Sequence, residues 1–244
     1  MSLTLYQFPI SHFCEKARWA LDFKALDYTT KNLLPGQHVK VIRRLAAQSS
    51  VPVLEHEGRS IQGSEQILTY LDEKFPARKL TPVNSGEAQA ALEWERYLDK
   101  EIGVHVRRYV YQTLLQHPSL VTGFFATGGP FWWRPWLRLI YPKLVTVMRK
   151  RMNINPATAA ESKQRVLMAL ERLNDSVGDS GYLVGAGFSR ADLTAAALLA
   201  PLFMPPQYGL NWPAALPEPL HSEVAALEPQ LQWARDIYAR YRGA

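Results

Sequence analysis

The order of short extended and helical runs in the first 76 residues constrains the fold more than any other feature. Residues 3–8 alternate in polarity and predict a strand that Pro9 ends, and residues 13–26 place apolar side chains at helical spacing. A second extended run follows over residues 26–33. Because parallel strands need a long crossover connection, this strand–helix–strand order predicts a parallel pair joined by a helix.

The remainder of this part predicts a short helix, a hairpin and another helix. These lie at residues 38–47, at 51–56 with 59–61, and at 64–75. Glu57-Gly58 forms the tight turn of the hairpin, which adds an antiparallel edge to the sheet. Together these elements predict an α/β unit with a mixed sheet.

Everything after residue 86 predicts helices and loops. Residues 77–86 are polar and contain proline, as is typical of a linker. We therefore predict a first domain over 1–76, a linker over 77–86 and an all-helical second domain over 87–244. Helices are expected at 87–116, 136–152, 156–177, 189–203 and 222–241, with a Gly- and Pro-rich loop around 128–130.

The composition is that of a folded globular protein. Hydrophobic residues make up 47% of the 244 residues and charged residues 20%, which excludes a disordered chain. No apolar run of about 18 residues predicts a membrane span, and the N-terminus carries no secretory signal. A single cysteine, Cys14, excludes an internal disulfide. A cytoplasmic location is therefore expected.

The positive charge is concentrated in one segment. The net charge is +6, and residues 102–160 contain eight Lys and Arg residues but no Asp or Glu. Such a segment favours anionic ligands, lipid head groups or nucleic acid, or it forms a solvated basic helix face. No nucleic-acid-binding motif accompanies the charge, so nucleic acid is not an expected partner. The histidines show no metal-ligand spacing, so no metal site is predicted.

Four motifs along the chain resemble a known family. They are Ser11-His-Phe-Cys14-Glu-Lys-Ala-Arg18, Val51-Pro-Val-Leu54, Gly63-Ser-Glu-Gln-Ile-Leu-Thr-Tyr-Leu71 and Gly187-Phe-Ser-Arg-Ala-Asp-Leu193. In order and spacing they resemble the glutathione transferase superfamily, and the first resembles the turn of serine-type, tau-class members. The resemblance implies a thioredoxin-like N-terminal domain, an all-α C-terminal domain, glutathione as cosubstrate and a homodimer.

Ser11 is the candidate catalytic residue. By resemblance, its hydroxyl donates a hydrogen bond to the glutathione sulfur at the start of the first helix. A thiol with a pKa near 8.5 is mostly neutral at pH 7, and both this hydrogen bond and the helix N-terminus would favour the thiolate. The alternative is that Ser11 only caps the helix.

The resemblance also assigns the residues that hold the tripeptide. Pro52 follows a bond expected to be cis, and the Val51 backbone would pair with the cysteinyl part of glutathione. Ser64, at a helix start, would hold the γ-glutamyl carboxylate. Glu65 is a candidate for the neighbouring amino group, because Gly63 occupies the position of the family's acidic or Gln residue.

A second departure lies before Val51-Pro52. Ser49 and Ser50 stand where relatives often offer a lysine to the glycyl carboxylate, and Lys40 or His38 are the nearby substitutes. The thiol end of the site is thus intact while both charged ends are altered. This supports a second hypothesis, a non-catalytic binding or scaffold protein of the same fold that contacts an anionic membrane surface or a protein partner.

Seven aromatic side chains lie within residues 124–141 of the basic segment, and we call this part the aromatic segment. The candidate residues of a pocket for an apolar electrophile are His12, Phe13, Trp132, Trp133 and Trp136. The alternatives for the aromatic segment are a membrane or partner surface and a packed core. Cys14 is expected either as a buried apolar side chain or as a resolving thiol.

Ser189 and Asp192 predict a structural feature. A serine followed three residues later by an acidic residue forms a capping box, which begins the helix of residues 189–203.

Overall fold

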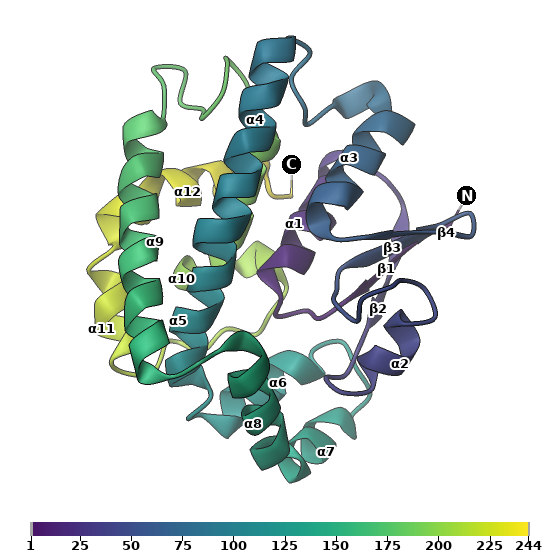
Figure 1. Ribbon diagram of the computed structural model, residues 1–244, viewed down its shortest axis with the longest axis vertical. Coiled ribbons are helices and arrows are strands. Elements are labelled where there is room, and N and C mark those ends of the chain that lie inside the picture. Colours follow the sequence, from purple (N-terminus) through teal and green to yellow (C-terminus); the bar gives the residue numbers. More distant parts are fainter. Residues whose placement is uncertain (1, 244) are drawn as a thin grey trace.

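The computed structural model describes residues 2–243, and its first part is the predicted α/β domain (Figure 1). The elements are β1 (Leu3–Gln7), α1 (His12–Phe23), β2 (Tyr28–Asn32), α2 (His38–Ile42), β3 (Val53–His56), β4 (Arg59–Gln62), α3 (Ser64–Lys74) and the short η1 (Pro76–Arg78). The order matches the sequence prediction, and the element ends differ from it by a few residues.

The four strands form one mixed sheet in the order β2-β1-β3-β4. β1 and β2 are parallel, with Leu3 opposite Tyr28. β3 runs antiparallel to both β1 and β4, with Leu3 opposite His56. The predicted parallel pair and antiparallel hairpin are therefore both confirmed.

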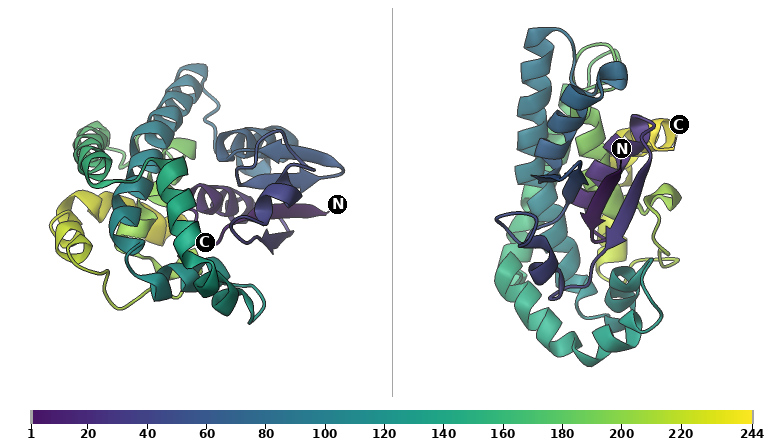
Figure 2. Two further views of the ribbon diagram at one scale, coloured as in Figure 1. Left: turned by 60° about the horizontal axis from the view of Figure 1, so that its bottom comes forward. Right: turned by 90° about the vertical axis from the view of Figure 1, so that its right-hand side faces the viewer.

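The two faces of the sheet carry different cores. Leu3, Leu5 and Leu54 lie in the large buried cluster that also contains the apolar faces of α1 and α3. Tyr6 and Val53, which alternate with them along the strands, pack with Ile42 of α2 on the other face. The helices of the second domain lie on the α1 side of the sheet, and α2 covers the opposite face (Figure 2).

The second domain is entirely helical within the described residues 79–243. Its elements are α4 (Ser85–Leu98), η2 (Asp99–Gly103), α5 (Val104–Leu114), α6 (Pro118–Ala126), α7 (Trp133–Leu139), α8 (Tyr141–Met152), α9 (Pro156–Ser176), α10 (Arg190–Phe203), η3 (Pro206–Tyr208), α11 (Leu220–Ala225) and α12 (Glu228–Tyr241). No helix among residues 2–243 has both the length and the apolar character needed to cross a bilayer.

Several predicted helices are divided in the structure. The helix expected over 87–116 contains a π-helical segment, η2, and the helix expected over 136–152 is two helices, α7 and α8. The helix expected over 222–241 likewise consists of α11 and α12. Pro142 and Pro229 lie in the first turns of α8 and α12, where a missing N–H does no harm. Helix α6 was not predicted, although Pro118 at its first position is a start signal.

Helix α10 lies at the centre of the molecule, and its residues from Arg190 to Leu202 are all buried. The predicted capping box begins it. The Asp192 carboxylate accepts hydrogen bonds from the backbone N–H groups of Leu183 and Ser189 at 2.8 and 2.9 Å and from the Ser189 hydroxyl at 2.8 Å. The box is thus a structural element inside the second domain, where it connects the start of α10 to the loop at Leu183.

A buried ion network also connects the domains. Lys16 of α1 pairs with Glu95 at 2.7 Å and Asp99 at 2.9 Å, both in the long helical segment of residues 85–114. Arg190 of α10 pairs with the same Glu95 at 2.5 Å and donates to the Thr69 hydroxyl of α3 at 3.0 Å. Two cations and two anions thus compensate each other in the interior.

Candidate functional site

A cavity of about 380 Å³ lies between the two domains. The first domain contributes the end of β1, the start of α1, the turn before α2 and the loop before β3, and the second domain contributes α5, α6 and α8. The residues of its wall on the first-domain side are Phe8, Ile10, Ser11, His12, Phe13, Pro35, Gly36, His38, Val39, Ser49, Ser50 and Val51.

Ser11 lies in this wall and caps α1. Its backbone is extended, with φ −76° and ψ 120°, and its N–H donates to the Phe8 carbonyl at 3.0 Å. Its Oγ accepts a hydrogen bond from the Cys14 N–H at 3.4 Å. The hydroxyl therefore sits at the positive end of a helix and on a cavity surface at the same time.

Cys14 points away from the cavity and is completely buried. Burial raises the pKa of its thiol, and the hydrogen bond to Ser11 only partly offsets this effect. A neutral buried thiol is a packing group and a poor nucleophile.

Val51 borders the same cavity, and the Val51–Pro52 bond is cis, as expected. The Pro52 carbonyl accepts a hydrogen bond from the Gly63 N–H at 3.0 Å, which connects this loop to the start of α3. Ser64 is buried as the first residue of that helix. Among the described residues, Pro52, Ser64 and Glu65 lie outside the cavity wall, on the side of it towards α3.

Gly63 and Glu65 each have a structural explanation. Gly63 has φ +97°, a conformation that favours glycine over the residues common at this family position. Glu65 pairs with Arg96 of α4 at 2.9 Å across the domain boundary. The carboxylate of Glu65 is thus engaged with the second domain in this structure.

His12 and Phe13 lie in the cavity wall on the first turn of α1. Burial and then the charge of Arg107 lower the pKa of His12 to about 3. Its Nε2 is buried without a hydrogen-bond partner among residues 2–243. His12 is therefore a neutral group throughout the usual working range of pH.

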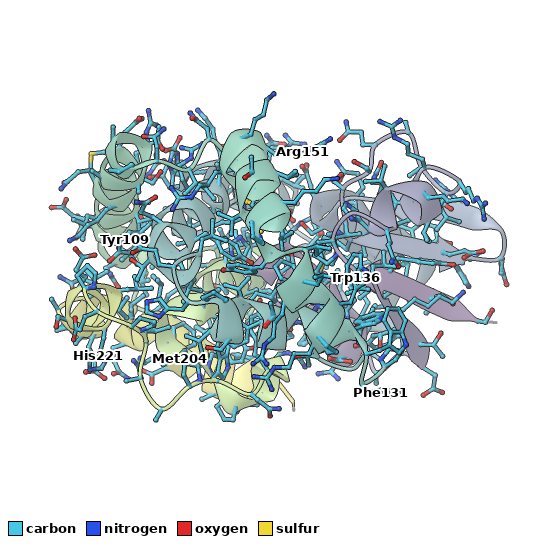
Figure 3. All side chains as sticks on the ribbon, turned by 90° about the horizontal axis from the view of Figure 1, so that it is seen from below. Tyr109, Phe131, Trp136, Arg151, Met204 and His221 are labelled. Carbon is cyan, nitrogen blue, oxygen red and sulfur yellow. The ribbon has the colours of Figure 1, made fainter. Side chains whose placement is uncertain are left out.

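The three tryptophans expected in the pocket lie elsewhere, which corrects that prediction. Trp132 is 43% exposed before α7, and Trp133 packs over the backbone of Gly129. Trp136, labelled in Figure 3, is partly buried against the core on α7. Because α7 packs on α6, its aromatic side chains cover that helix and the turn beside it, and α5, α6 and α8 form the wall.

The first domain is similar to a known protein family. Residues 5–79, which contain Ser11, Val51, Pro52 and Ser64, match the family model described as the N-terminal domain of glutathione S-transferases. The match places the N-terminal domain of this chain, residues 5–79, in the glutathione S-transferase superfamily.

The chain has relatives among curated plant proteins. It is 33% identical over 109 residues to a probable glutathione S-transferase, GSTU1, of Oryza sativa subsp. indica. The match covers 41% of this chain and 47% of the relative, so the chain spans about half the length of this curated relative. The tau-like turn expected from the sequence is consistent with such relatives.

Solved structures show the same fold along the whole chain. Glutathione transferase F7 from Populus trichocarpa has a TM-score of 0.67 at 18% identity, over 99% of this chain and 95% of that one. A glutathione S-transferase from Methylobacterium radiotolerans, in complex with glutathione sulfonate, has a TM-score of 0.60 at 21% identity, over 99% and 95%. The thioredoxin-like domain followed by an all-α domain is thereby confirmed.

The second-domain wall of the cavity contains residues beyond the five pocket candidates named from the sequence. They are Val106, Arg107, Val110, Tyr111, Leu114, Phe124, Phe125, Leu144, Val147, Met148, Arg151, Met152, Pro201, Trp212 and Leu216. On α5 the spacing of four between 106, 110 and 114, and between 107 and 111, is the signal that one helix face lines a site.

Proposed function

We propose that this protein is a glutathione transferase in which Ser11 stabilises the thiolate of bound glutathione. The observation that carries the proposal is the position of the Ser11 Oγ, at the start of α1 and in the wall of a largely apolar cavity. Its Oγ accepts only a long hydrogen bond of 3.4 Å from the Cys14 N–H, and rotation of the hydroxyl would direct its proton to a bound sulfur.

The chemistry follows from lowering the pKa of the thiol. The thiol proton leaves to solvent, and the sulfur lone pair forms a bond to an electrophilic carbon. In a substitution the leaving group departs with the electrons of its bond, whereas in an addition those electrons move along the acceptor. The protein contributes a higher thiolate fraction and a fixed approach of the two reactants.

The same proposal places the tripeptide along the first domain. The backbone of Val51, which borders the cavity and precedes the cis bond, suits an extended peptide, and the N-terminus of α3 at Ser64 suits a carboxylate. Pro52 forms the cis bond of that loop, and Glu65 on the first turn of α3 is the candidate for the γ-glutamyl amino group once it exchanges its contact with Arg96. His12 and Phe13 would separate the sulfur from the helical wall.

Substitutions at Ser11 test the proposal. Ser11→Ala removes the hydroxyl and the helix cap, whereas Ser11→Gly removes the hydroxyl but keeps most of the cap's stability, within about a few tenths of a kcal/mol. Both variants should lose most turnover of 1-chloro-2,4-dinitrobenzene with glutathione. Ser49→Ala, at another serine of the same cavity, is the matched control and should keep it. Wild-type turnover in Ser11→Gly would reject the role of Ser11.

A binding or scaffold protein is the second candidate function. Gly63 and the serines at 49 and 50 favour it, since both charged ends of the tripeptide lose a customary partner. Calorimetric titration with glutathione separates the candidates. A dissociation constant well below the millimolar range supports the enzyme, and millimolar or weaker binding supports the scaffold.

The α7 surface favours a membrane or protein partner for that scaffold. Phe131 is 92% and Leu139 80% exposed, and Arg134 and Arg138 lie between them in the sequence. Phe131 is labelled at the lower edge of the molecule as drawn in Figure 3. Flotation with vesicles of anionic and of neutral lipids tests membrane contact, with Phe131→Ser as the variant that should weaken it.

We further propose a cytoplasmic homodimer. The proposal rests on the family resemblance and on the single cysteine, which is buried. Sedimentation equilibrium tests the oligomeric state, and a monomer at micromolar concentration would reject it.

A further inference from the structure

Arg107 is a cation without a partner in the cavity wall. It lies on the second turn of α5 and borders the cavity. Within residues 2–243 no carboxylate pairs with it, and its Nε is buried without a hydrogen-bond partner. Arg107 is partly exposed and borders the cavity, so the positive charge of its guanidinium faces a space without a counter-charge, and an anion bound there would compensate it.

The surroundings of Arg107 offer no negative charge. No Asp or Glu borders the cavity among the described residues. The titratable groups nearest to Arg107 are His12 of α1 and Arg108 and Tyr111 of its own helix. His12 is neutral because of its low pKa, and burial raises the pKa of Tyr111, which keeps the phenol neutral too.

The rest of this wall is apolar and shaped by large side chains. Val110 and Leu114 continue the face of α5 that carries Arg107, while Phe125 and Met148 approach from α6 and α8. An acidic group at Arg107 would therefore be attached to an apolar body that occupies the remaining volume of about 380 Å³.

We infer that the second ligand of this cavity is an apolar, ring-containing molecule with one carboxylate or sulfonate, and that Arg107 binds this acidic group. The inference names the class of the electrophile in the proposed function. Its statement about reaction with glutathione rests on that function, whereas its statement about ligand binding does not. The planar guanidinium presents paired N–H donors to an oxyanion, and charge-assisted hydrogen bonds of this kind are strong in a cavity that excludes water. Because Nε is enclosed, the donors offered to the ligand are the N–H groups of the two terminal nitrogens of Arg107.

A pair of dyes that differ in one acidic group tests the inference without any catalysis. 8-Anilinonaphthalene-1-sulfonate carries a sulfonate, and N-phenyl-1-naphthylamine has the same aromatic body without it. We expect Arg107→Met to weaken binding of the sulfonate dye at least about tenfold and binding of the neutral dye less than about twofold. Only the sulfonate dye loses charge-assisted hydrogen bonds in this variant. Lys150→Met removes an exposed cation of α8 that does not border the cavity and should change the binding of neither dye more than about threefold.

Two further measurements separate this inference from the proposed function. The urea midpoint of Arg107→Met should equal or exceed that of the wild type, because the variant removes an unpaired charge. Glutathione affinity should be unchanged in it. Equal weakening of both dyes, no weakening of the sulfonate dye, or loss of glutathione binding in Arg107→Met would overturn the inference. A wild-type protein that binds no glutathione would reject the proposed function and leave the dye comparison intact.

Discussion

Lys16 on α1 and Glu95 on α4 form an ion pair of 2.7 Å in which neither side chain has any exposure to solvent. The pair joins the thioredoxin-like domain to the helical domain, and Lys16 lies on the same helix that Ser11 caps. Because each charge has left water completely, each depends on the other for its stability in the interior.

Removal of one member of this pair should unfold the protein at a much lower urea concentration. Lys16→Met leaves Glu95 and Asp99 with fewer positive partners and should cost about 3–5 kcal/mol of unfolding free energy. Lys163→Met is the control, since Lys163 pairs with Glu223 at 2.9 Å with both side chains about one-third exposed. That variant should lose less than about 1 kcal/mol. Equal midpoints for the two variants would contradict a stabilising role of the interdomain pair.

The capping box of α10 should matter more than an exposed cap of the same type. Ser189→Ala should cost about 1 kcal/mol. Asp192→Ala should cost about 3 kcal/mol, because it leaves the buried N–H groups of Leu183 and Ser189 unpaired. Asn155→Ala at the more exposed start of α9, where Asn155 Oδ1 accepts from Thr158, should cost about 1 kcal/mol. Urea midpoints measure all three, and an Asp192 effect no larger than that of Asn155 would speak against burial as the cause.

His12 should make the protein less stable in acid. Its pKa in the folded protein, about 3, lies below its unfolded value of about 6.5, so the unfolded chain binds the extra proton between these values. Stability is therefore complete above about pH 6.5 and is lost as the pH falls towards 3. Between pH 7 and pH 5 the wild type should lose about 2 kcal/mol that His12→Gln does not lose.

The control for this pH dependence is His221→Gln, at an exposed position of α11. It should follow the wild type in urea titrations at both pH values. If His12→Gln and the wild type lose the same stability, His12 is not the group that titrates.

A methyl group added at Gly103 should displace the side chain of Phe13 in the cavity wall. A Cβ at this position would lie 2.5 Å from the Cζ of Phe13 and 3.3 Å from the Cδ1 of Leu198. Gly103→Ala should therefore push Phe13 towards the cavity and cost about 1–3 kcal/mol. Gly123→Ala on α6 meets open space and should stabilise the protein by up to about 1 kcal/mol. Thermal unfolding compares the two, and a stabilised Gly103→Ala would contradict the close packing.

The first domain was predictable because its signals are local. The alternation at Leu3 and Leu5 and the turn at Glu57-Gly58 each fix an element within a few residues. The first-domain half of the cavity follows from them, since Ser11 and Val51 end or precede such elements. The predicted domain limits, 1–76, 77–86 and 87–244, remain a prediction.

The half of the cavity wall that the second domain contributes was not predictable from local sequence signals. Which helix face meets the cavity depends on how α5, α6 and α8 pack, and apolar spacing alone does not separate a cavity wall from a core. Phe124 and Trp132 both belong to the aromatic segment, yet Phe124 borders the cavity and Trp132 does not. Arg107 was visible only as one of several cations, because its lack of a partner is a property of the tertiary structure.

The π-helical segment η2 sets the direction in which α5 points its side chains. An extra residue in one turn rotates everything that follows by about 100° around the helix axis relative to an uninterrupted α-helix. Shortening residues 99–103 by one would let the segment from Ser85 to Leu114 run on as a regular helix. Arg107 and Val110 would then turn away from the opening beside Ser11, so the register of a single turn determines which chemistry the second domain presents to the first.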